Sequence, residues 1–266
     1  MRIVALPMYD LPEIAAATDA WWRGLASAFR SEGLAGVPNR LDRRRARRQV
    51  WGSPGLLFAQ TCGYPLTHEF AGRLTVLATP CYDAPGCEGP RYRSLIVVRA
   101  NHRALTFADL RGGVAAINTP DSHSGFNILR WLAAREGGPS PFFRAVRVTG
   151  NHRASLAAVR GGEADLAAID CVTYALLARH APAELEGARV IAQTPSAPGL
   201  PYVTSATVSA DEVAALRRGL AGALADARLA AVRQTLLLEG AVTAGSGDYQ
   251  DIVTFAREGA GALDPG

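Results

Sequence analysis

Residues 114–136 place a row of polar side chains directly after an apolar run. The sequence VAAINTPDSHSGFNILRWLAARE ends that run at Asn118 and passes through a proline turn into a segment with helical spacing. The first turn of a helix has N–H groups without intrahelical partners and carries about half a positive charge. Ser122, Ser124 and the amides around Gly125 can therefore surround the oxygens of an anion without any lysine or arginine, and the glycine allows close approach.

Capping is a simpler role for the same residues. Asp121, Ser122 or Ser124 can each satisfy the free N–H groups of the helix start. One cap needs one such residue, whereas here four polar residues stand in a row. The motif alone leaves both interpretations open.

Two further polar sets follow apolar runs in the same way. Asn151 and His152 come after residues 145–150, and Asp170 ends the run 166–170. In open α/β sheets, ligands bind outside the carboxyl ends of the strands. Each residue alone is an ordinary helix start, but their common location predicts a binding site at one edge of a sheet.

Strands and helices are expected to alternate along most of the chain. Short apolar runs with β-branched residues predict strands at 2–7, 55–60, 74–79, 94–99, 114–118, 145–150, 166–170, 189–194 and 202–208. Helical spacing predicts helices at 18–33, 124–136, 152–162 and 172–181, and at least two more in 209–240, where Ser209 and Glu212 form a capping box. This alternation predicts an α/β fold with mostly parallel sheets flanked by helices.

The order of these segments also predicts two domains. A series of βα units from about 100 to 195 is flanked by extended stretches that can cross between domains. We expect a discontinuous first lobe, 1–97 plus 198–266, and an inserted second lobe, 98–197. A single doubly wound domain stays open as the alternative.

Composition indicates an ordinary folded protein. The chain has 266 residues, 48% of them hydrophobic and 20% charged, and a formal charge of +4 to which lysine contributes nothing. The basic run 43–48, RRRARR, has no interleaved aromatic residues. We interpret it as a solvated helix face and expect no nucleic-acid partner.

Neither export nor membrane insertion is expected from the chain as given. The N-terminal apolar run is short, and no segment reaches the roughly 18 apolar residues of a membrane helix. The four cysteines make no metal-binding pattern. Cys81 and Cys87 could bridge in an oxidising compartment, but unpaired thiols are the expectation.

Several motifs together give the chain a family resemblance. From about residue 64 to 205, the elements YRSLIVVR, DLRG, NTPDSHSGFN, TGNHRASLAAV and GGEADLAAID follow one another in order. Because these motifs occur in this order, the chain resembles the phosphate, phosphite and phosphonate-type substrate-binding proteins of ABC importers. The resemblance implies the type II periplasmic-binding-protein fold, with two lobes joined by two crossing strands and closing on a ligand between them.

The resemblance also assigns roles to individual residues. Ser122, His123 and Ser124 match the Ser-Thr-Ser anion-binding element of the family. His123 replaces the threonine, which enlarges that position and makes it sensitive to protonation. Tyr92 matches a tyrosine that meets the anion from the other lobe, and His152 matches a histidine that donates to an anion oxygen.

The match is looser elsewhere. Asp170 lies near the place where an acid contacts the other end of the ligand in aminoalkyl-phosphonate binders. Thr61 and Tyr64 lie near the expected pocket, but their segment, 59–66, has no clear match to the aromatic residue that the family has there. The segment 195–202, PSAPGLPY, offers no carboxylate for an amine. The sequence therefore predicts anion recognition and leaves the organic part of the ligand open.

The resemblance implies a monomeric solute-binding protein for a small oxyanion, with an ABC permease as partner and neither a cofactor nor a metal. Such proteins are usually periplasmic, whereas this chain by itself suggests the cytoplasm. A cytosolic ligand sensor and a biosynthetic enzyme on the same scaffold remain alternatives. Catalysis is disfavoured because no nucleophile and base are arranged together.

Overall fold

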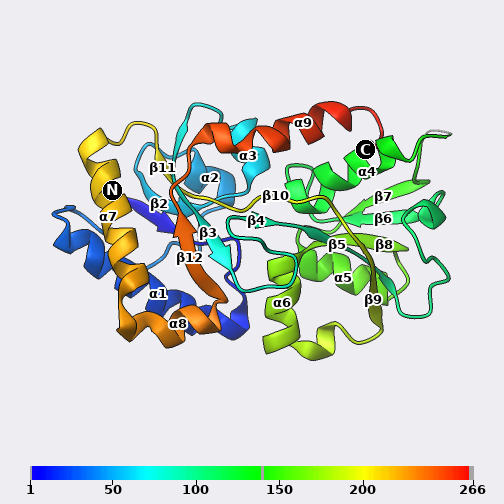
Figure 1. Cartoon of the computed structure of the whole chain (residues 1–266), viewed down its shortest axis with the longest axis horizontal. Helices are drawn as coiled ribbons and strands as arrows, with labels where there is room; N and C mark the ends of the chain where they lie inside the picture. Colours follow the sequence, from blue (N-terminus) through cyan, green and yellow to red (C-terminus); the bar gives the residue numbers. More distant parts are fainter. Residues whose placement is uncertain (1, 139–140, 264–266) are drawn as a thin grey trace. The chain divides into compact units, whose positions relative to one another are not determined.

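The computed structural model describes residues 2–138 and 141–263, which form two compact units. The first unit comprises Met1–Asp83, Glu88–Pro90 and Pro198–Tyr249. The second comprises Ala84–Cys87, Arg91–Ala197 and Gln250–Gly266. Each is built on its own five-stranded sheet (Figure 1).

The sheet of the first unit has the order β1-β2-β11-β3-β12. Its strands are β1 Ile3–Ala5, β2 Leu56–Gln60, β11 Tyr202–Ser205, β3 Leu74–Tyr82 and β12 Leu238–Val242. The pair β1 and β2 is parallel, whereas β11 runs antiparallel to both β2 and β3. β12 pairs antiparallel with β3 at the sheet edge.

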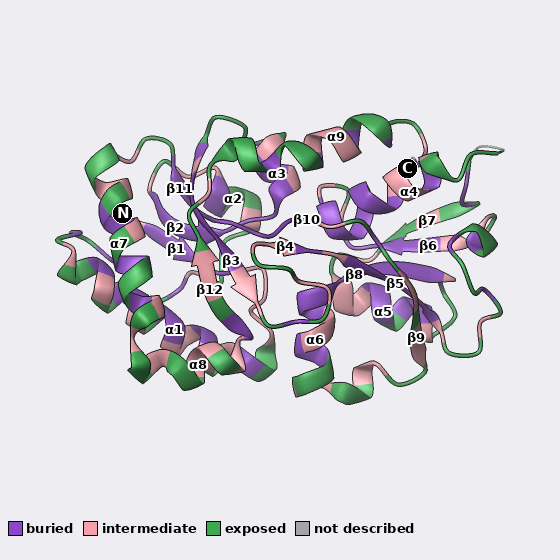
Figure 2. Ribbon diagram, viewed as in Figure 1, coloured by how far each residue is buried: buried purple, intermediate pink, exposed green. Residues whose placement is uncertain are grey.

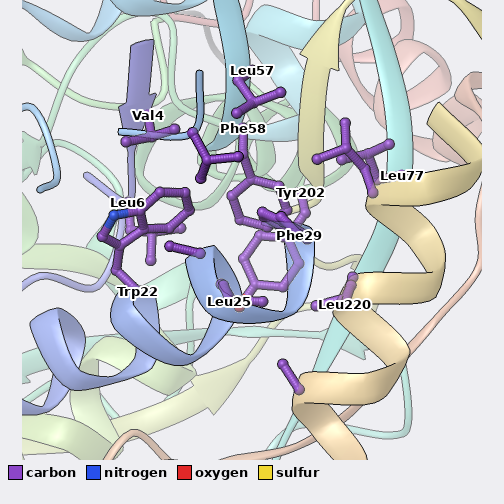
Figure 3. Packing of buried hydrophobic residues seen from close by; sticks show 14 of the residues in the cluster. Val4, Leu6, Trp22, Leu25, Phe29, Leu57, Phe58, Leu77, Tyr202 and Leu220 are labelled. Carbon is purple, nitrogen blue, oxygen red and sulfur yellow. The ribbon is translucent and has the colours of Figure 1, made fainter. Parts of the chain in front are cut away.

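Aromatic side chains fill the core of the first unit. Helix α1 (Ala15–Ser31) contributes Trp22 and Phe29, which pack against Phe58 of β2 at ring-centroid distances of 6.2 and 5.3 Å (Figure 3). Tyr202 of β11 packs against Phe58 in a tilted arrangement, with the ring centroids 4.9 Å apart. Helix α7 (Ala210–Ala225) closes this core with Leu216 and Leu220. Burial of these large side chains stabilises the unit by roughly 1.5–3 kcal/mol each relative to exposure.

The sheet of the second unit has the order β7-β6-β8-β5-β9. Its strands are β7 Ala145–Val148, β6 Val114–Ile117, β8 Leu166–Asp170, β5 Ser94–Arg99 and β9 Ala188–Gln193. β6 pairs in parallel with β7 and β8, and β5 runs antiparallel to β8 and β9. Residues of both faces of β5 and β8 are buried (Figure 2), which explains their continuous apolar sequences.

The remaining elements are short or cover these sheets. In the first unit they are α2 Arg47–Trp51, α3 Gly63–Thr67 and α8 Ala230–Thr235. In the second unit they are α4 Ile128–Arg135, α5 His152–Arg160, α6 Cys171–His180 and α9 Gln250–Glu258. A two-stranded sheet pairs β4 (Arg91–Tyr92) with β10 (Ala197–Pro198). None of the helices within the described ranges is both long and apolar enough to cross a membrane.

The architecture confirms the α/β fold class and corrects its details. The sheets are mixed, because the antiparallel strands β5 and β11 are inserted beside parallel neighbours. The second unit ends its long segment at Ala197, as expected, but that segment begins at Arg91 instead of residue 98, and the chain from Gln250 onward also joins this unit. Residues 91–97 belong to the second unit because β5 pairs with β8 and β9, and residues 250–266 belong there because α9 packs on α4.

Two local expectations were wrong in part. The run 209–240 contains α7 and α8, but its end belongs to strand β12, which pairs with β3. Residues 43–46 form a loop before the short helix α2 instead of a helix face. Ser209 caps α7 by accepting a hydrogen bond from the Glu212 amide, while the Glu212 carboxylate pairs with Arg2.

Candidate functional site

Three helix starts lie along one edge of the second sheet. β6, β7 and β8 form parallel pairs in the order β7-β6-β8, so their carboxyl ends meet at the same edge. Asn118 follows β6, His152 begins α5 after β7, and Asp170 ends β8. The backbone thus gathers the three polar sets.

Asn118, Ser122, Ser124 and His152 form one hydrogen-bonded group, here called the polar cluster. The Asn118 amide donates to Ser122 Oγ at 2.9 Å and lies 3.4 Å from His152 Nε2. Ser124 Oγ lies 2.9 Å from the same His152 nitrogen. Ser122 and Ser124 are buried in the second unit, and His152 is half-buried. The cluster holds two hydroxyls and an imidazole at the start of a helix.

Ser122 caps that helix, whose first turn is a π turn over His123–Asn127 that leads into α4. Its Oγ accepts a hydrogen bond from the Gly125 amide at 3.1 Å. The capping role that the sequence left open is therefore present. It uses only the acceptor side of the hydroxyl, so the Ser122 proton can still be donated.

Gly125 is required by its neighbour Asn118. A Cβ at this position would lie 2.0 Å from Asn118 Oδ1, which no side-chain adjustment of a few tenths of an ångström relieves. The Asn118 oxygen is itself held by the Thr119 amide at 2.8 Å. The close approach that Gly125 permits is thus to Asn118, whose amide in turn positions Ser122.

His123 is turned away from this group, contrary to the sequence expectation of a protonation-sensitive position. Its ring is buried, and the ring centroid lies 5.7 Å from that of Phe255 in α9. Arg130 donates to Asn127 Oδ1, so the Asn127 amide nitrogen faces His123 Nδ1 at 3.1 Å and donates to it. Burial lowers the pKa of His123 to about 3, with the Asp251 carboxylate opposing that shift. The imidazole is therefore neutral near pH 7.

The helix starts after β7 and β8 are also capped. Asn151 accepts from the Ala154 amide at 2.9 Å. Asp170 Oδ1 accepts from the amides of Val172 and Thr173 at 2.8 and 2.9 Å. The carboxylate of Asp170 is almost fully buried. Its visible role is to cap α6, and contact with a ligand stays a prediction.

The remaining expected residues lie in different parts of the chain. Tyr92 is buried in the second unit, where its ring centroid lies 6.3 Å from that of His123, so it belongs to the same unit as the serines. Thr61 and Tyr64 belong to the first unit. Thr61 is buried and its amide donates to Pro201, while Tyr64 stacks on His68 at 4.0 Å.

Sequence reasoning missed three polar residues in or around this helix start. Asn118 was visible as the last residue of its strand, but its links to Ser122 and Gly125 come only from the fold. Ser94, in β5, donates to the Ser124 carbonyl at 2.9 Å. Asn127 holds His123, and its spacing of four residues on a helical turn was the available signal.

The basic run lies in the first unit, where its residues 43–45 line an open hollow of about 920 Å³ together with Arg2 and Arg40. Much of its charge is paired. Arg43 contacts Asp10 and Asp19 at 2.5 and 2.7 Å, and Arg45 pairs with Asp42. In the part of the chain that the structure describes, no three side chains of the metal-ligating types gather in one place.

The comparisons with known proteins agree with this fold. A family model described as the periplasmic substrate-binding protein of phosphonate ABC transporters matches residues 55–249. No curated protein matches the chain in sequence.

Three solved structures share the architecture at low sequence identity. PhnD1 from Prochlorococcus marinus in complex with methylphosphonate has a TM-score of 0.78 at 13% identity, covering 97% of both chains. A binding protein component of an ABC phosphonate transporter from Pseudomonas aeruginosa has a TM-score of 0.76 at 16% identity, covering 96% of this chain and 86% of that one. A Xanthomonas citri protein bound to chloride ion has a TM-score of 0.73 at 14% identity, covering 97% and 96%.

Proposed function

Because this chain belongs to the family of periplasmic substrate-binding proteins of phosphonate ABC transporters, we propose that it captures a small tetrahedral oxyanion for ABC-type uptake. The ligand class is phosphate, phosphite or a small phosphonate. The observation that carries the proposal is the polar cluster, in which Ser122, Ser124 and His152 meet at a helix start.

The donors of this helix start suit an oxyanion, since they comprise backbone amides, two hydroxyls and the imidazole of His152. Ser122 Oγ takes the Gly125 amide of the π turn, and the two serine hydroxyls stand beside the amides of that first turn. A hydrogen bond to a charged oxygen contributes roughly 1.5–3 kcal/mol before ordering is subtracted. A handful of such bonds is enough for micromolar binding, which corresponds to about 8 kcal/mol.

His152 determines which way the Ser124 proton points. A neutral His152 with a lone pair on Nε2 accepts that proton, and Ser124 then offers no hydrogen to an anion. A protonated His152 donates to Ser124 Oγ across the 2.9 Å contact, which releases the serine hydrogen for a ligand oxygen. Anion binding therefore favours a His152 with hydrogen on Nε2, which both the neutral Nε2–H tautomer and the protonated ring supply, and the protonated ring adds attraction between opposite charges.

Isothermal titration calorimetry of the purified chain tests the proposal. Methylphosphonate, phosphite and phosphate are titrated separately, with an amino acid of similar size as control. We expect micromolar or tighter binding of at least one of the three oxyanions. An absence of heat and of ligand-induced thermal stabilisation with all three would overturn the proposal.

Stoichiometric binding distinguishes this function from catalysis. A binding protein returns the phosphonate unchanged, so phosphorus NMR of the mixture shows one resonance over many hours. Release of inorganic phosphate in excess of the protein concentration would instead support the enzyme alternative.

A further inference from the structure

A pair of thiols in the second unit lies outside the polar cluster and has no role in the proposed function. Cys87 and Cys171 are distant in sequence, yet their sulfur atoms lie 3.6 Å apart. Both residues belong to the second unit. The sequence analysis expected unpaired thiols and named Cys81 and Cys87 as the pair that could bridge in an oxidising compartment.

The backbone around Cys87 is shaped for this approach. The Cys87 amide donates to the Ala84 carbonyl at 2.9 Å, which closes a turn. Within that turn Gly86 has a φ of 102°, and a Cβ on it would lie 3.2 Å from the Cβ of Cys171. A glycine at this position therefore lets the loop reach the second cysteine.

Cys171 is held firmly on the other side. It is the first residue of α6, is almost fully buried, and donates its amide to the Arg93 carbonyl at 3.1 Å. Cys87 is half-buried, so a small reagent can reach it first. Closing the gap from 3.6 Å to the roughly 2 Å of a disulfide needs a displacement that a loop can supply.

We propose that Cys87 and Cys171 form a disulfide when the protein meets a low-molecular-weight disulfide oxidant. The Cys87 thiolate attacks one sulfur of the oxidant, forming a mixed disulfide and expelling one small thiolate. Deprotonated Cys171 then attacks the Cys87 sulfur, forming the protein disulfide and expelling the second small thiolate. Two protein thiols are oxidised, the oxidant is reduced to two small thiols, and the cysteine protons pass to them through water.

Cys81 is a poorer partner for this reaction. It lies on β3 in the first unit, and burial raises the pKa of its thiol. A raised pKa leaves less of the reactive thiolate near pH 7.

The test treats the folded, full-length chain with oxidised glutathione and then maps its thiols. Quantification after unfolding should fall from the four thiols of the reduced chain to about two, and mass mapping should recover the peptides of Cys87 and Cys171 joined to each other. Oxidation should raise the unfolding midpoint by roughly 5–15 °C, because the crosslink closes a long loop in the unfolded chain.

Three variants make the result specific. Cys81→Ser should behave as the wild type. Cys87→Ser, at a half-buried position, and Cys171→Ala should each lose both the crosslink and the rise in midpoint. Recovery of Cys87 and Cys171 as thiols or single glutathione adducts, or joined to other cysteines, would overturn the proposal. Because no phosphonate takes part, this outcome is independent of the binding experiment.

Discussion

Two neighbouring strands of the second sheet, β6 and β8, each end at a helix start that a side chain caps. After β6 the cap is Ser122, a neutral hydroxyl beside Ser124 and His152. After β8 the cap is Asp170, a buried carboxylate that takes two amides. Both satisfy the helix, but only the first leaves neutral donors for an anion, because a carboxylate repels one. If the proposed site is right, the charge of the capping group is what distinguishes a helix start that binds an anion from one that is only capped.

The largest effect is expected when the neutral cap of the first helix start is replaced by a carboxylate like that of the second. Ser122→Asp keeps a good N-cap but adds a negative charge where the oxyanion is proposed to bind. Two unit charges about 4 Å apart repel by about 4 kcal/mol at an effective dielectric constant of about 20. We expect methylphosphonate affinity to fall about 100-fold or more, measured by calorimetry.

The matched control is Ser209→Asp, which makes the same change at the cap of α7 in the first unit. It should leave both affinity and thermal stability near the wild type. Equal binding by wild type and the Ser122 variant would mean that the anion does not meet this helix start.

Within the first helix start, His123 and Ser124 differ in the same way. His123 faces the protein core, whereas Ser124 faces His152. The pKa of His123 is lowered from 6.5 to about 3, so between these values the unfolded chain binds a proton that the folded chain does not. Lowering the pH from about 7.5 to 5 should therefore cost about 2 kcal/mol of unfolding free energy through this residue.

The variant His123→Gln should remove that part of the acid sensitivity. Glutamine keeps an acceptor for Asn127 and does not titrate, so its unfolding free energy should depend less on pH over this range. Chemical denaturation at several pH values provides the measurement, and His68→Gln, at an exposed position, is the control. Parallel pH profiles for the wild type and His123→Gln would show that the ring is not held neutral.

Removing the second hydroxyl is expected to have a smaller effect. Ser124→Ala deletes one donor to the oxyanion and the contact with His152, so affinity should fall about tenfold. Arg44→Ala, on an exposed loop of the first unit, should change affinity little and serves as the control. If both variants bind with wild-type affinity, Ser124 is only a structural residue.

The coupling between His152 and Ser124 gives a pH dependence of binding. If the anion binds beside protonated His152, affinity should fall about fivefold more in the wild type than in His152→Asn between about pH 5.5 and 8.5. The comparison between the two proteins cancels the titration of the phosphonate itself. Identical slopes would exclude a charged role for His152.

The fold was largely predictable because its signals are local. Apolar runs such as SLIVVR and LAAID marked the strands, and the polar residues after them marked the helix starts. The run LLLEGAV was one exception, since helical spacing continues up to it. Its strand form depends on pairing with residues 79–82 of β3, which are far away in the sequence.

The location of the candidate site was predictable from the sequence, but its hydrogen bonds and side-chain directions were not. The sequence indicated Ser122 and Ser124, yet it could not show that Gly125 makes room for Asn118. Nor could it show that His123 turns into the core. The groups around His123 come from α9 and from a π turn, and no residue pattern predicts that π turn. The 3.6 Å approach of the Cys87 and Cys171 sulfur atoms could not be foreseen for the same reason, because the two residues are far apart in the sequence.

The smallest expected effect tests the second helix start directly. Asp170→Asn keeps the cap of α6, since asparagine is an equally good N-cap, and it removes the charge. If Asp170 acts only as a cap, the affinities for methylphosphonate and 2-aminoethylphosphonate should both change less than about threefold in calorimetry. A loss confined to 2-aminoethylphosphonate would show that the carboxylate meets the ligand's ammonium group, and the two helix starts would then bind opposite ends of one molecule. The two ligands differ by an aminomethyl group, whose ammonium is its only charged part, so the experiment decides whether α6 only lies beside the site or also binds the ligand.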